Sequence, residues 1–142
     1  MFWGVGASAG SAFAFVMMAL ILTGACLPGP ALSAPEKKPD YSLLTGKWVR
    51  PDGGYVIHVR SIESDGAADA SYSNPSEIHV AEAKVSMKEG SMKLYMRLEG
   101  KGYPVSTYTL YYYAEKDALA GFYYQAAMDQ TFEVVFIREK AE

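Results

Sequence analysis

Hydrophobic and polar residues alternate with a period of two through much of the chain after residue 45. The inward sets of the three clearest runs are Tyr55, Ile57 and Val59; Leu94, Met96 and Leu98; and Phe132, Val134 and Phe136. This period is typical of β-strands that bury one face. Beyond the leader there is no apolar stripe with a helical period, so the pattern predicts an all-β domain.

Turn residues divide this domain into eight strand-like runs, each closed by Gly, Pro, Asn or Asp. The expected strands cover residues 46–50, 55–62, 67–73, 78–87, 92–99, 106–114, 119–125 and 131–138. Short connections favour pairing between neighbours in sequence. We therefore predict an eight-stranded antiparallel up-and-down β-barrel, with a sandwich of two four-stranded sheets as the alternative. Such a barrel has room for a filled core or for one small ligand.

The first 35 residues contain no Lys, Arg, Asp or Glu. Residues 12–25 are almost wholly apolar, and a signal peptide needs roughly 7–15 such residues before a small-residue cleavage site. We expect residues 1–34 to be a signal peptide, although no positive charge precedes the apolar run. An uncut leader is the alternative, because about 20 apolar residues suffice to span a bilayer as an anchor. Either reading implies an exported protein, periplasmic or secreted.

Cys26 is the single cysteine, so the chain has no internal disulfide. The segment Leu22–Cys26 resembles the bacterial lipobox, in which the cysteine is lipidated, but Thr23 stands where Leu is usual. The other reading is a small apolar residue within the leader. Residues 35–43 are polar with two prolines, which predicts a linker before the barrel domain of residues 44–142.

Charge and composition limit the classes of partner that we expect the protein to bind. The chain has 13 Lys and Arg against 16 Asp and Glu, for a net charge of −3. Acidic and basic residues are well mixed, and nucleic acid needs a concentrated basic face, so we expect no nucleic-acid partner. Membrane contact is expected only through the leader or a lipid anchor.

Tyrosine is the compositional oddity, since all eleven lie beyond residue 40. A buried tyrosine offers a large apolar face and a hydroxyl that seeks a partner. We expect four of them to bind a ligand at the open end of the barrel: Tyr72, Tyr108, Tyr111 and Tyr123. The alternative is ordinary strand surface, because tyrosine is also a good strand former.

Other candidate chemistry is sparse. His58 and His79 lie on different strands without a set of converging ligands, so we expect no metal site. Arg97 and Glu133 are expected to face solvent, with pairing inside the barrel as the alternative. No nucleophile motif or phosphate loop is present, which favours a protein that is not an enzyme and uses no cofactor.

The segment Leu44–Trp48 carries a Gly-x-Trp motif that resembles the first strand of the calycins, the lipocalins and avidins. Gly53 and the run from Asp65 to Tyr72 are similar in order to the next avidin strands. The resemblance implies a barrel whose closed end is crossed by Trp48, with Tyr72 at a ligand position. The whole chain also resembles a group of small exported bacterial proteins to which no activity is attached.

The biotin site does not carry over with this resemblance. Arg50 and Gly54 stand where avidins have a ligand-binding Asn and Ser, and no Trp follows Trp48. Our leading hypothesis is therefore an exported binding barrel that holds a small, partly apolar molecule of unknown identity. The alternative is an envelope protein-interaction or inhibitor module with a filled barrel, using exposed tyrosines and the loop of residues 100–104.

Overall fold

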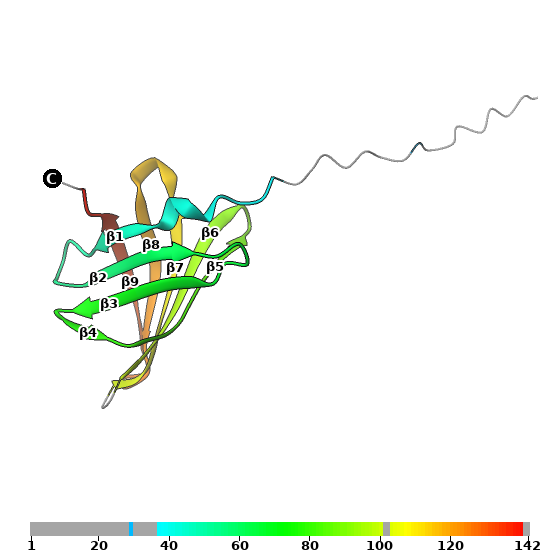
Figure 1. Ribbon diagram of the computed structural model, residues 1–142. Helices are drawn as coiled ribbons and strands as arrows, with labels where there is room; N and C mark the ends of the chain where they lie inside the picture. Colours follow the sequence, from blue (N-terminus) through cyan, green and yellow to red (C-terminus); the bar gives the residue numbers. More distant parts are fainter. Residues whose placement is uncertain (1–28, 30–36, 101–102, 141–142) are drawn as a thin grey trace, which may run out of the picture. The chain divides into compact units, whose positions relative to one another are not determined.

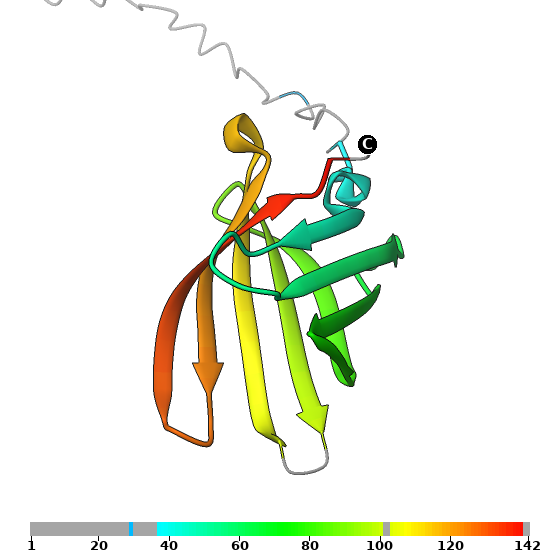
Figure 2. The ribbon, with the colours of Figure 1, turned by 90° about the vertical axis from the view of Figure 1, so that its left-hand side faces the viewer.

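A computed structural model of the protein describes residue 29 and residues 37–100 and 103–140. From residue 37 onward, one antiparallel sheet of nine strands curls into a nearly closed barrel (Figures 1 and 2). The elements are η1 Tyr41–Leu44, β1 Gly46–Val49, β2 Val56–Ile62, β3 Ala68–Asn74, β4 Ser76–Ile78, β5 Val80–Lys88, β6 Ser91–Gly100, β7 Tyr103–Tyr113, η2 Ala114–Lys116, β8 Ala118–Gln125 and β9 Gln130–Arg138.

The strand order in the sheet is β4-β3-β2-β1-β9-β8-β7-β6-β5. Strands that follow one another in sequence pair with each other, except β4 and β5, which are the two edges of the sheet. In addition, β1 pairs with β9, which joins the first strand to the last. That seam is short, with Trp48 opposite Arg138 and Val49 opposite Ile137. The prediction of an all-β, antiparallel up-and-down barrel is confirmed, and the sandwich alternative is wrong because the sheet is continuous.

The sheet has nine strands rather than eight because the expected run of residues 78–87 is divided. After Pro75 the chain reverses tightly, with Asn74 opposite Ser76, and the short β4 pairs with β3. The chain leaves this pairing at His79, and β5 then pairs with β6. The two parts of this segment therefore lie at opposite edges of the sheet. The chain bends between them, as strands do where a sheet turns a corner.

Gly66, in the turn before β3, makes a backbone contact with the edge strand β5. Its φ is +90°, and its carbonyl accepts a hydrogen bond of 2.7 Å from the amide of Val85 on β5. A Cβ on Gly66 would lie 2.0 Å from the Val85 carbonyl oxygen. Only glycine allows both the positive φ and this close approach between β-turn and strand.

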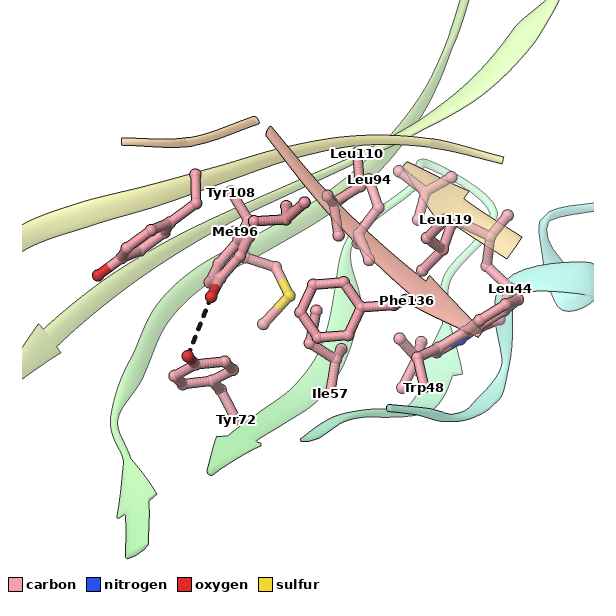
Figure 3. Close-up of a cluster of buried hydrophobic side chains, with 14 of the residues drawn as sticks. Leu44, Trp48, Ile57, Tyr72, Leu94, Met96, Tyr108, Leu110, Leu119 and Phe136 are labelled. Carbon is pink, nitrogen blue, oxygen red and sulfur yellow. Dashed lines mark hydrogen bonds between the residues drawn. The ribbon is translucent and has the colours of Figure 1, made fainter. Parts of the chain in front are cut away.

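The buried hydrophobic side chains form one core cluster inside the barrel (Figure 3). The expected inward sets of β2 and β6 are confirmed, because Ile57, Val59, Leu94, Met96 and Leu98 are buried. Trp48 is buried beneath η1 and donates a hydrogen bond of 2.9 Å from its indole nitrogen to the carbonyl of Leu44. We call the Trp48 side the closed end and the opposite side, near Tyr72, the open end.

Several expectations concern residues that the structure does not describe. They are the leader of residues 1–34, apart from Gly29, lipidation at Cys26, and the centre of the loop of residues 100–104. Within residues 37–100 and 103–140, none of the helices combines the length and the apolar character that a membrane crossing requires.

Candidate functional site

A row of four side chains crosses the inner face of the sheet toward the open end. Met96 on β6 lies opposite Tyr108 on β7, Tyr108 opposite Tyr123 on β8, and Tyr123 opposite Phe132 on β9. The first three are buried, whereas Phe132 is 40% exposed although it lies on the inward face. The core therefore reaches solvent at the end of this row, which we call the inner-face row.

Three of the tyrosines form one cluster, Tyr72, Tyr108 and Tyr123, named here the tyrosine cluster. The hydroxyls of Tyr72 and Tyr108 lie 3.0 Å apart and share a hydrogen bond across the barrel (Figure 3). The rings of Tyr108 and Tyr123 stack with centroids 4.6 Å apart. The Tyr123 ring in turn stacks on Phe132 at 6.3 Å. The cluster thus places polar hydroxyls within an aromatic core.

Burial raises the pKa of Tyr108 to about 12, and the hydrogen bond from Tyr72 only partly offsets this effect. Removing Tyr108 from water disfavours its phenolate. At neutral pH the hydroxyl is therefore protonated and can both donate and accept. No buried side-chain nitrogen or oxygen in the described part of the chain lacks a hydrogen-bond partner.

Arg50 lies beside this cluster at the open end. Two residues after Trp48, it continues the inward face of β1, and its side chain is only 15% exposed. Its Nε and Nη2 donate to the two carboxylate oxygens of Asp52 at 2.8 and 2.5 Å. Its guanidinium carbon lies 4.3 Å from the centroid of the Tyr55 ring. The pKa of Arg50 is raised chiefly by the hydrogen bond with Asp52, and Tyr108 raises it further.

Gly53 makes the stacking of Tyr55 possible. A Cβ on Gly53 would lie 2.6 Å from the Tyr55 ring, so the ring folds over the turn where a side chain is missing. The turn itself is closed by the Gly53 amide, which donates to the Arg50 carbonyl at 3.4 Å. Arg50 is thus held between an aromatic ring and a carboxylate.

Tyr111 does not join the tyrosine cluster. It follows Tyr108 by three residues, so it lies on the outer face of β7, opposite Lys93 and Ala120. There it lines a recess of about 340 Å³ over β7, β8 and β9. Exposed apolar side chains share this outer face: Tyr113, Phe122, Val135 and Ile137. Strands β7–β9 are therefore apolar on both faces.

Two further recesses lie elsewhere on the surface. One of about 360 Å³ is lined by residues 112–116, at the connection between β7 and β8. The other, about 230 Å³, lies between Lys38–Tyr41 and Ile62–Ser64. Neither contains a residue of the tyrosine cluster.

The remaining charged candidates lie outside the core. Arg97 pairs with Glu82 at 3.7 Å and with Glu99, and Glu133 is exposed. Both therefore face solvent, as expected. Within the described residues, no three His, Cys, Asp or Glu side chains gather as metal ligands.

Neither Arg50 nor Phe132 was expected at the open end, although Phe132 was expected on the inward face. The available signal was alternation, since Arg50 follows the inward Trp48 by two residues and Phe132 precedes the inward Val134 by two. Neither a protein-family model nor a curated protein matches this chain.

Proposed function

We propose that the protein is an exported, non-catalytic binding protein that holds a small, partly apolar ligand at the open end of its barrel. The observation that supports this proposal most directly is the exposed, inward-facing ring of Phe132 at the end of the inner-face row. An uncovered aromatic surface beside a few polar groups is typical of small-molecule sites. Tyr72 and Tyr108 supply such groups deeper in the barrel.

We also propose that the barrel is calycin-like, as the resemblance of Leu44–Trp48 implies. The buried position of Trp48 under η1 supports this proposal. The proposal concerns the fold alone, because a ligand must be argued from the residues at the site.

A protein-interaction module is the second candidate function. The outer face of β7–β9 favours it, because Phe122 is 47% exposed there and Tyr113, Val135 and Ile137 are similarly uncovered. Contiguous exposed apolar side chains commonly mark interaction surfaces. In this case the barrel interior would serve only as a scaffold.

Two matched phenylalanines separate the candidates. Phe122 and Phe132 lie on adjacent strands and are similarly exposed, but they face opposite sides of the sheet. The experiment is native mass spectrometry of the protein purified gently from its own host, with Phe132→Ala and Phe122→Ala purified in parallel. We expect the wild type to carry a discrete added mass that is lost on denaturation. Phe132→Ala should lose this mass, whereas Phe122→Ala should keep it.

A clean mass for the wild type would contradict the proposal. Loss of a protein partner in Phe122→Ala, with Phe132→Ala unaffected, would support the interaction module instead. Circular dichroism of both variants checks that the fold survives. The same spectra test export, because the mass shows whether the leader is removed or Cys26 is lipidated.

A further inference from the structure

We propose that the ligand of the open end carries a carboxylate, which Arg50 binds in place of Asp52. This inference rests on the proposed function and names the chemical class of the ligand, a small organic anion with an apolar or aromatic body. It makes Arg50 the residue that selects the ligand and Asp52 an internal competitor for the same guanidinium.

Two ion pairs of the same geometry show what is particular about Arg50. Arg50 binds Asp52, and Arg60 binds Asp69, through Nε at 2.8 Å and Nη2 at 2.5 Å in both pairs. The Arg60 side chain is 46% exposed, whereas that of Arg50 is 15% exposed. Arg60 thus belongs to a surface ion pair, whereas Arg50, of these two arginines, is the one that stacks on an aromatic ring.

The Arg50 guanidinium is fixed before a ligand arrives. The Tyr55 ring covers one face of it, Gly53 allows that ring to lie close, and Asp52 holds its Nε and Nη2. A planar guanidinium in a fixed orientation recognises a carboxylate through two parallel hydrogen bonds. Because Arg50 is already ordered, little conformational entropy is lost when an anion binds.

Asp52 is suited to leave this pair. Its side chain is 64% exposed on the turn after β1, and Arg50 lowers its pKa, so it is an anion at neutral pH. A released Asp52 carboxylate is hydrated at once, at small cost for a surface ion pair. An incoming carboxylate keeps Arg50 paired, so no uncompensated charge is left in the partly buried site.

The body of such a ligand has an apolar surface to meet. Tyr108, which also raises the pKa of Arg50, stacks on Tyr123, and Tyr123 stacks on the exposed ring of Phe132. An anion held by Arg50 can therefore direct an aromatic or apolar group toward the inner-face row. Aromatic pairs contribute beyond their buried area when they stack with an offset.

The test compares two probes that differ only in charge, 2-naphthylacetate and 2-naphthylacetamide. Their binding to the full chain, freed of any co-purified ligand, is measured by titration calorimetry. We expect the acid to bind at least about tenfold more tightly than the amide, as one charge-assisted bidentate interaction provides. Arg50→Gln should abolish this difference. Asp52→Asn should tighten binding of the acid by about threefold or more, since the internal competitor is weakened.

Arg60→Gln and Asp69→Asn are the matched controls, and neither should change the affinity for either probe. Equal affinity for acid and amide would overturn the carboxylate inference while leaving the proposed function standing. A weaker acid affinity in Asp52→Asn would also overturn it, and this exposed residue can be changed without disturbing the core. Binding of neither probe would also overturn the carboxylate inference, whereas the proposed function is decided by the native mass spectrum of the wild type.

Discussion

The guanidinium of Arg138 lies over the Trp48 ring, 4.1 Å from its centroid, and ties the last strand to the first. Its Nε donates to Asp117 at 2.7 Å, and Nη1 and Nη2 donate to the carbonyls of Thr45 and Leu43, each at 2.6 Å. One side chain thus holds η1, the turn before β8 and the β1–β9 seam. The planar guanidinium suits this role because it presents several donors in fixed directions.

Arg138→Lys should therefore destabilise the protein by about 2 kcal/mol, because an ammonium cannot satisfy the three acceptors and the ring together. Urea unfolding followed by circular dichroism gives this value. Hydrogen exchange at the amides of Ser42 and Thr45 should accelerate as η1 loosens. Arg97→Lys is the control, with an expected change below about 0.5 kcal/mol for a surface pair. Equal losses in the two variants would contradict the role of Arg138.

The hydroxyl pair of Tyr72 and Tyr108 predicts non-additive losses of stability. Tyr108→Phe should cost about 1–2 kcal/mol, because it removes one partner of a buried hydrogen bond. Tyr72→Phe should cost a similar amount, and the double variant should cost less than the sum. Urea unfolding of the four proteins completes the cycle. Strict additivity would mean that the two hydroxyls do not stabilise one another.

Alkaline pH should weaken the fold through Tyr108. Its folded pKa of about 12 exceeds the ordinary value of 10.0, so the unfolded chain loses this proton first. The contribution of Tyr108 to the free energy of unfolding is complete below about pH 10. It declines as the pH rises toward about 12, by at most about 1.4 kcal/mol per pH unit. Tyr112 adds in the same direction, because burial and Asp117 raise its pKa.

We therefore expect the free energy of unfolding to fall between about pH 10 and 11.5, with a shallower slope in Tyr108→Phe. Urea titrations at several pH values measure both slopes. Slopes that coincide would show that Tyr108 titrates normally in the folded protein.

Gly66→Ala should be among the most damaging single changes to the backbone. The substitution strains a residue with φ of +90° and places a Cβ 2.0 Å from the Val85 carbonyl oxygen. We expect a loss of at least about 2 kcal/mol from these two effects. Gly54→Ala is the control, because nothing lies within 4 Å of its added Cβ. The two variants are compared by thermal unfolding, and a tolerated Gly66→Ala would contradict the closure described for this edge.

Local alternation was enough to predict which side chains fill much of the barrel. Leu94, Met96 and Leu98 recur with a period of two and are all buried. Alternate residues of a strand point to the same face, so a buried face can be recognised from the residues of a single strand. The same rule applies to Tyr108 and Tyr111, which were both expected at the open end. Three residues separate them on β7, so they lie on opposite faces.

Contacts between distant segments were beyond the reach of that rule. The hydroxyl bond between Tyr72 and Tyr108 depends on the curvature that brings β3 across the barrel to β7. The contact between Gly66 and Val85 likewise appears only when the sheet closes, although the turn at Gly66 was expected. Strand register and closure set these distances, and neither is encoded by the residues of one segment.

The pairing of the first and last strands, β1 and β9, brings the two ends of the barrel domain close together. The Glu139 amide donates to the Lys47 carbonyl at 2.9 Å, and the two side chains pair at 3.6 Å. A short glycine-rich bridge from Lys140 to the start of η1 would therefore need to cross little space. New termini could then be opened at the exposed turn of Glu89 and Gly90. Such a circular permutant should retain the barrel, because the pairing of the strands, rather than their order along the chain, defines this domain.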